Sequence, residues 1–264
     1  MHKDARKNAR GQGSLPEERR VAILGHLAVA GRVVCSELAR EWNISEDTVR
    51  RDIRDLDDAG LLRRVHGGAL PRNARPVPYG DRVQADIAMK QRIAARAALA
   101  VVDGMTALFY GGTTTLAATR LLPSGIRARI ITNDPRIALE ASGRERLETI
   151  LLGGRVHPGM QLVLGSQAVD AVRALHADVC LVGACALHDE FGLGVEDVEE
   201  AVLQQAFIAA ASSVVALVTP EKLQTVAPFR VTSATAVARI ITSANADDDV
   251  LARYRTVGIV VDAV

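Results

Sequence analysis

The stretch SEDTVRRDIRDLDDAGLLRRVHGGAL, residues 45–70, joins an amphipathic helix to a Gly-Gly turn between two short apolar segments. At about 100° per residue, Val49, Ile53 and Leu56 fall on one narrow stripe, which predicts a buried helix face. Ser45 precedes the helix and is suited to cap it, because its hydroxyl can accept a hydrogen bond from the first turn. Three basic side chains occupy the opposite side: Arg50, Arg51 and Arg54.

The charge pattern of this helix fits two alternatives. In a helix that is merely solvated, Arg51 would pair with Asp47 and Asp55, which lie one turn away on either side. In a helix that lies against a polyanion, the same arginines would contact phosphates and base edges. The helix alone leaves both alternatives open.

The surrounding sequence favours DNA. A first helix is predicted from Ser14, with Pro16 in its first turn and its end at Gly31; Val33 and Val34 then form a short strand, and Ser36 opens a second helix. Two helices, a tight turn and a third helix predict a helix-turn-helix, and residues 61–70 add a wing. The candidate DNA-binding residues are polar or basic and lie on the second helix, the third helix or the wing: Ser36, Ser45, Thr48, Arg50, Arg51, Arg54, Arg63, Arg64 and His66.

The chain of 264 residues has room for a small domain and a medium one. We expect a disordered basic lead (1–13), a winged helix-turn-helix domain (14–72), a linker with prolines and a glycine (73–84) and a second domain (85–264). A net charge of +1 means that any electrostatic function must be local. The cysteines show no metal-ligand spacing and no apolar run is long enough to span a membrane, so we expect a cytoplasmic protein without a metal site.

The second domain alternates short apolar segments with helical ones. The predicted strands are residues 106–110, 128–132, 148–153, 178–183, 212–218, 238–242 and 256–261. Continuous apolar strands with helical crossovers predict a Rossmann-like α/β domain, in which helices cover both faces of a parallel sheet. Small ligands bind such sheets beyond the carboxyl ends of the strands.

The turn after the first of these strands has the composition of a phosphate-binding loop. In GGTTT, residues 111–115, the glycines let an anion approach the backbone and the following helix presents free N–H groups. A tight turn that is capped by threonine and binds no ligand would have the same composition, so this alternative stays open. The loop lacks the lysine of a P-loop and the GxGxxG spacing, which disfavours nucleotides, and we expect no cofactor. The candidate effector-binding residues lie in this loop and at other strand ends: Lys90, Tyr110, Gly111, Gly112, Thr113, Thr114, Thr115, Asn133, Gly165, Cys185 and Lys222.

Both parts of the chain resemble one family. TVRRDIRDLDDAGLLRRVHGGA resembles the N-terminal signature of the DeoR family of bacterial transcription regulators; GGTTT, ITNDPRIALE, LLGGRVHPGMQLVLG and EEAVLQQAFIAAASSVVALV resemble its C-terminal sensor domain. The resemblance implies a repressor of carbohydrate catabolic genes whose binding to double-stranded operator DNA is modulated by a phosphorylated sugar or a similar metabolite. It also implies a sensor fold related to sugar-phosphate isomerases, and a homodimer or homotetramer.

The sequence departs from the family where a sugar would bind. Family members usually have aspartates where this chain has Tyr110 and Thr219, and an acidic segment of the family is here GACALH, residues 183–188. The phosphate end is thus kept and the sugar end altered, which indicates an unusual effector or weakened sugar binding. Two other functions remain open: a DNA-binding protein whose sensor ignores metabolites, or an isomerase or deaminase. For catalysis only His188 and Asp189 would remain as acid and base, and we expect no catalytic residue.

Overall fold

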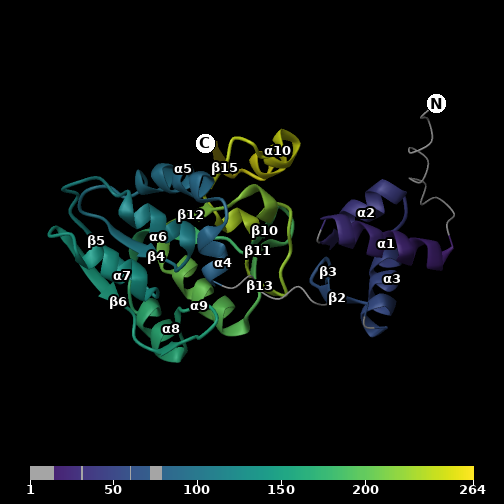
Figure 1. Cartoon of the computed structure of the whole chain (residues 1–264), viewed down its shortest axis with the longest axis horizontal. Helices are drawn as coiled ribbons and strands as arrows, with labels where there is room; N and C mark the ends of the chain where they lie inside the picture. The colour runs from purple at the N-terminus through teal and green to yellow at the C-terminus, as the bar shows by residue number, and fades with distance from the viewer. Residues whose placement is uncertain (1–14, 31, 60, 72–78) are drawn as a thin grey trace. The chain divides into compact units, whose positions relative to one another are not determined.

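The computed structural model describes residues 15–30, 32–59, 61–71 and 79–264, which belong to two compact units, residues 1–75 and 76–264 (Figure 1). The basic lead, the predicted cap Ser14, the predicted helix ends at Gly31 and Gly60, and residues 73–78 of the linker lie outside the described residues. Each unit has a hydrophobic core of its own.

The N-terminal unit is a winged helix, as predicted. Its elements are α1 (Pro16–Ala30), β1 (Val33–Val34), α2 (Cys35–Trp42), α3 (Glu46–Asp58), β2 (Leu62–Val65) and β3 (Gly68–Pro71). The antiparallel sheet has the order β1-β3-β2. Gly67 turns the wing with a φ of 81°, in the left-handed region that favours glycine. Gly68 is also required, because a Cβ there would come within 2.0 Å of the Val33 carbonyl oxygen.

The C-terminal unit is the predicted α/β domain. Its parallel sheet has seven strands in the order β15-β14-β12-β9-β4-β5-β6. In chain order these are β4 (Thr106–Phe109), β5 (Ala128–Thr132), β6 (Leu147–Leu151), β9 (Ala177–Gly183), β12 (Ala211–Leu217), β14 (Arg239–Thr242) and β15 (Val260–Ala263). The α-helices are α4 (Tyr79–Gln84), α5 (Ile87–Ala98), α6 (Thr113–Arg120), α7 (Pro135–Ser142), α8 (Ser166–Arg173), α9 (Val198–Ala209) and α10 (Asp248–Thr256).

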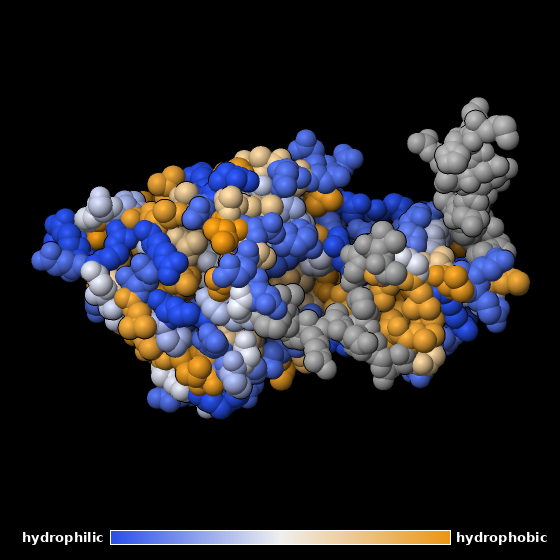
Figure 2. Space-filling model, viewed as in Figure 1, coloured by the Kyte–Doolittle hydropathy of each residue, from blue (hydrophilic) through white to orange (hydrophobic). Residues whose placement is uncertain are grey.

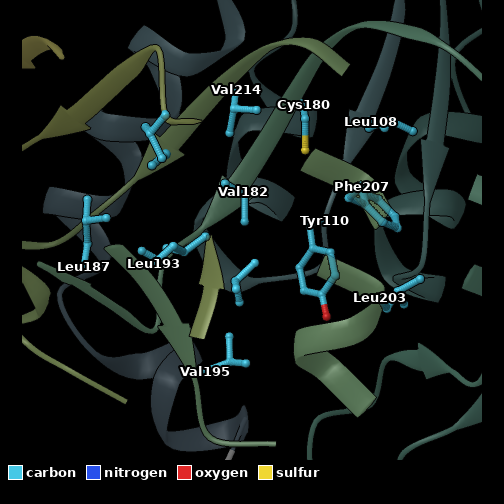
Figure 3. Close-up of a cluster of buried hydrophobic side chains, with 14 of the residues drawn as sticks. Leu108, Tyr110, Cys180, Val182, Leu187, Leu193, Val195, Leu203, Phe207 and Val214 are labelled. Carbon is cyan, nitrogen blue, oxygen red and sulfur yellow. The ribbon is translucent and has the colours of Figure 1, made fainter. Parts of the chain in front are cut away.

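Helices cover both faces of the sheet. Along β4, Ala107 and Phe109 pack with α5, α6 and α7 on one face, whereas Leu108 packs with α8, α9 and α10 on the other. Tyr110, directly after the strand, joins the second group (Figure 3). This alternation follows from the period of two along a strand, and it explains why the strands are apolar throughout.

Some elements differ from the predictions. The last strand begins at Val260 rather than Thr256, because α10 extends to Thr256 and Gly258 turns the chain with a φ of 88°. Residues 79–84, expected in the linker, form α4. The short strands β7 (Arg155–Val156), β8 (Val163–Leu164), β10 (Ala186–His188), β11 (Gly192–Val195) and β13 (Phe229–Thr232) and the 3₁₀ turns η1 (Pro220–Lys222) and η2 (Ala234–Ala236) were not predicted.

Candidate DNA-binding surface and effector site

Helix α3 is fixed at its start and along its inner face. The Ser45 hydroxyl accepts a hydrogen bond from the backbone N–H of Thr48 at 3.2 Å, which confirms Ser45 as the cap, and the two hydroxyl oxygens lie 2.8 Å apart. Asp52, buried on α3, accepts from the Nε of Arg19 on α1 at 2.7 Å. Because α3 is anchored by its inner side chains, its outer face points reproducibly to solvent.

The three arginines of α3 are exposed, as predicted. Arg50 is paired with Glu46 and, at 3.5 Å, with Asp47, so its charge is partly neutralised on the helix itself. Arg51 and Arg54 form no ion pair with any residue that the structure describes. The pairs expected for a merely solvated Arg51 do not form: Asp47 turns to Arg50, and Asp55 on the inner flank turns to Arg20 of α1.

The other candidates on this unit differ in exposure. Arg64 and His66 are exposed on the wing, and Arg63 is half-buried beside them. Ser36 is only 9% exposed on α2, which leaves little of its hydroxyl for a phosphate. The DNA-facing candidates therefore concentrate on α3 and the wing.

The loop after β4 is held in place by its neighbours. The backbone N–H of Gly111 donates to the Asn133 Oδ1 at 2.9 Å, and Asn133, fully buried after β5, accepts at its backbone oxygen from the N–H of Val163 at 2.8 Å. A Cβ on Gly111 would lie 2.2 Å from the Cδ2 of Leu162 and 2.9 Å from the Asp134 Cβ, so any other residue would force these neighbours to shift. The loop thus lies at the carboxyl ends of β4 and β5, where the sequence placed it.

The start of α6 presents free donors. The backbone N–H groups of Gly112, Thr113 and Thr114 form no hydrogen bond within the described residues. The Thr115 hydroxyl, by contrast, donates back to the Gly112 carbonyl at 2.9 Å. Free N–H groups at a helix start, where the helix dipole is positive, favour an anion.

An acidic side chain beside the loop is neutralised. The Asp134 carboxylate lies against Gly111, but Arg136 donates to its two oxygens at 2.7 and 2.8 Å. The Arg136 guanidinium also lies 3.5 Å from the ring centre of Tyr79 on α4. This pairing leaves the loop without an uncompensated negative charge.

Two lysines add positive charge. Lys90 on α5 is 8% exposed, and its ammonium group donates to the backbone oxygen of Arg82 on α4. Burial and then the nearby Lys222 ammonium lower the pKa of Lys90, with Asp86 and Glu221 partly opposing them. Two like charges held near each other favour the entry of an anion.

The other end of the site lies around Tyr110. Its ring packs edge-on against Phe207 of α9, with centres 5.1 Å apart, and its hydroxyl donates to the backbone oxygen of Glu200 at 3.5 Å (Figure 3). Cys185 is close to Glu200 and Lys222, and burial raises the pKa of its thiol to about 12. Burial also raises the pKa of Glu200 to about 7. Glu200 was not among the predicted site residues, although its spacing from Phe207 puts both on one helix stripe.

The remaining candidates lie near this site or apart from it. Gly165 starts α8 with a φ of 110°, two residues after the Val163 that contacts Asn133. The Thr219 hydroxyl donates to Glu221. His188, named above as a possible acid or base, is buried in β10, with its Nδ1 2.9 Å from an Asp189 carboxylate oxygen. The described residues contain no group of three or more side chains placed to hold a metal ion.

Comparison with known proteins covers both units. Residues 19–73 match the DeoR-like helix-turn-helix domain, and residues 85–244 match the DeoR C terminal sensor domain. The HTH-type transcriptional regulator GlpR of Haloferax volcanii is 29% identical over 95% of this chain and 99% of its own. The HTH-type transcriptional repressor CsqR of Escherichia coli is 31% identical over 73% and 74%, and the glycerol-3-phosphate regulon repressor of the same species is 28% identical over 72% and 76%.

Solved structures are more distant. Ribose 5-phosphate isomerase A of Methanocaldococcus jannaschii shares 17% identity over 52% of this chain and 55% of its own, with a TM-score of 0.39. That similarity is too low to assign a reaction. No helix among the described residues is long and apolar enough to cross a membrane.

A winged helix that matches the DeoR-like helix-turn-helix domain, followed by an α/β domain that matches the DeoR C terminal sensor domain, defines a transcriptional regulator with a C-terminal sensor domain. The chain belongs to the DeoR family.

Proposed function

We propose that the protein is a sequence-specific repressor of carbohydrate catabolic genes in the cytoplasm, and that a phosphorylated sugar or a similar metabolite modulates its operator binding. One observation carries this proposal: a single chain combines an exposed arginine face on α3 with unpaired N–H donors at the start of α6. The names of the relatives, among them a glycerol-3-phosphate regulon repressor, support it.

On the DNA side, α3 enters the major groove. Arg51 and Arg54 supply guanidinium groups that are free to meet guanine edges or phosphates, with Thr48 beside them at the helix start. Arg64 and His66 on the wing contact backbone phosphates, which fix the register on the duplex. Arg50 contributes less, because Glu46 and Asp47 already balance its charge.

On the effector side, the phosphate binds the N–H groups of Gly112, Thr113 and Thr114, and the Lys90 and Lys222 ammonium groups supply positive charge for it. Tyr110, Cys185 and Thr219 border the part that receives the rest of the effector. They offer hydroxyl and thiol groups where the family usually has carboxylates, so the effector differs from the family's commonest ones.

Fluorescence anisotropy with DNA from upstream of the protein's own gene tests the proposal. We expect the affinity for this DNA to fall as the salt concentration rises. We also expect at least one phosphorylated sugar to change that affinity by about tenfold, whereas the same sugar without phosphate leaves it unchanged. If the protein showed no preference for this DNA over random duplex, its role as a regulator would be refuted. If no phosphorylated sugar changed its affinity for DNA, its role as a sensor would be refuted. A turnover assay on ribose 5-phosphate should show no isomerisation.

We also propose a homodimer or homotetramer. The sheet edge at β6 exposes Ile150 and Leu151, and Leu139 on neighbouring α7 is 75% exposed. Figure 2 shows hydrophobic surface gathered over this part of the domain. Exposed apolar patches of this kind mark association surfaces. Analytical ultracentrifugation should show a dimer or larger species for the wild type and a smaller one for Leu151→Lys; a monomeric wild type would refute the assembly.

A further inference from the structure

Glu200 is a buried acid without a partner for its charge. Its backbone is fully used: the N–H donates to the Asp197 side chain at 3.0 Å, and the oxygen accepts from the Tyr110 hydroxyl. The side chain is only 6% exposed, yet its carboxylate forms no hydrogen bond or ion pair with the described residues. A buried carboxylate without partners destabilises a fold, and the positive end of the α9 dipole, which the exposed Glu199 also meets, offsets only part of that cost.

A second buried polar side chain, Gln204, lies one helical turn after Glu200. Gln204 is fully buried, and both its amide nitrogen and its amide oxygen lack a hydrogen-bond partner among the described residues. Residues four apart on a helix share a face, and Phe207, which packs on Tyr110, lies on that face as well. Glu200 and Gln204 therefore form a polar stripe on the Tyr110 side of α9.

Charged and polar groups lie near this stripe within an otherwise apolar core, and the stripe adjoins the phosphate loop. The Arg82 guanidinium is close enough to favour the ionised form of Glu200, and its own buried Nε has no hydrogen-bond partner among the described residues. The Cys185 thiol is near enough to both Glu200 and Lys222 for their charges to act on its pKa, which Glu200 raises and Lys222 lowers. Tyr110, which reaches from Gly111 to the first turn of α9, connects the stripe directly to the loop.

We propose that Glu200 and Gln204 bind the hydroxyl groups of a phosphorylated polyol or sugar whose phosphate lies at the start of α6. The inference rests on the proposed function and names the residues that would meet the part of the effector beyond its phosphate. The carboxylate accepts hydrogen bonds from two neighbouring hydroxyls, and the amide both donates and accepts. Polar groups that serve to bind a ligand have no hydrogen-bond partner until the ligand is present, and the Glu200 carboxylate and the Gln204 amide fit this description.

Calorimetric titration of the full-length protein tests this assignment with inorganic phosphate, glycerol 3-phosphate, ribose 5-phosphate and glucose 6-phosphate. The variants are Glu200→Gln and Gln204→Leu. Glu199→Gln is the matched control, because Glu199 is the adjacent acid, exposed and paired with Arg155. We expect the wild type to bind at least one polyhydroxylated phosphate about tenfold more tightly than inorganic phosphate.

Glu200→Gln and Gln204→Leu should each remove most of that tenfold preference and leave the affinity for inorganic phosphate unchanged. Each should also raise the melting temperature of the ligand-free protein at pH 8. Glu199→Gln should keep the preference. A purely structural role would lower the melting temperature and weaken all ligands together, which would overturn the assignment. Equal preference in Glu200→Gln and wild type would overturn it while the proposed sensor stands; a wild type that binds none of the four probes would overturn both.

Discussion

Arg19 and Asp52 form a two-pronged ion pair between α1 and α3: Nε and Nη2 of the arginine donate to the two carboxylate oxygens at 2.7 and 3.1 Å. The side chains are 14% and 3% exposed. The hydrogen bond to Asp52 raises the pKa of Arg19, which keeps the guanidinium charged. It fixes the rotation of α3 about its axis and hence the face that α3 presents to DNA.

Arg19→Ala should therefore destabilise the N-terminal unit by about 3–5 kcal/mol, because it leaves Asp52 buried and unpaired. The matched control is Arg20→Ala, which breaks the more exposed Arg20–Asp55 pair and should cost about 0–1 kcal/mol. Urea unfolding followed by fluorescence measures both, since Trp42, the single tryptophan of the chain, lies in the core of this unit. Equal losses in the two variants would contradict the role of Arg19.

Arg51→Ala should weaken specific DNA binding by about 1–3 kcal/mol if Arg51 reads a base. If it contacts phosphate only, affinity should fall evenly across sequences and the salt dependence should flatten. Arg50→Ala is the control and should have the smaller effect, because Arg50 is already paired on its own helix. Anisotropy titrations at several salt concentrations separate these outcomes, and an Arg51→Ala variant that binds like the wild type would rule out a DNA contact.

Gly111→Ala should abolish the response to phosphorylated effectors and keep DNA binding. The added methyl group would lie 2.2 Å from the Leu162 side chain and 2.9 Å from the Asp134 Cβ, so the loop would have to move. Gly143→Ala places its methyl group no closer than 3.7 Å to its neighbours and serves as the control. Effector titrations of the DNA complex compare the two variants; a normal response in Gly111→Ala would show that the loop tolerates movement.

Glu200 makes the stability of the effector-free sensor unit depend on pH. Its pKa is raised from 4.5 to about 7 by burial, so the folded state keeps a proton that the unfolded state has lost. Stability should therefore fall between about pH 5 and pH 7, by roughly 3 kcal/mol in total, and level off above that range.

Glu200→Gln should remove this fall, and the variant should be more stable than the wild type at pH 8 but not at pH 4.5. Urea unfolding followed by circular dichroism at several pH values gives the comparison. Parallel pH profiles for the two proteins would show that Glu200 keeps an ordinary pKa.

Much of the fold could be predicted because its signals are local. The cap at Ser45, the stripe of Val49, Ile53 and Leu56, and the seven apolar strands all follow from periodicity. Helix α4 could not be predicted, because a stretch with prolines and a glycine is typical of a linker. It is held by contacts with distant residues: Tyr79 stacks on Arg136, and Lys90 binds the Arg82 carbonyl.

The candidate effector site divides in the same way. The loop at Gly111 follows a strand and could be placed from the sequence. Glu200 could not, because an acid in the first turn of a helix already has a reason of its own in the helix dipole. Its burial depends on Tyr110 and on the packing of Phe207, which tertiary structure alone brings together.

The strand order of the sheet also bears on how the chain folds. In the N-terminal unit, Val65 and Gly68 pair across the wing turn, and Val33 and Ala69 pair across half the sequence separation of Ala107 and Val179 in the sensor. In the sensor, β4 cannot pair with β9 until the chain up to Val179 has been made, because Ala107 pairs with Val179. Strand β12 then pairs between β9 and β14. Long-range parallel pairing closes slowly. We expect the winged helix to fold early during synthesis, so that a nascent chain gains its DNA-binding unit well before its sensor unit is complete.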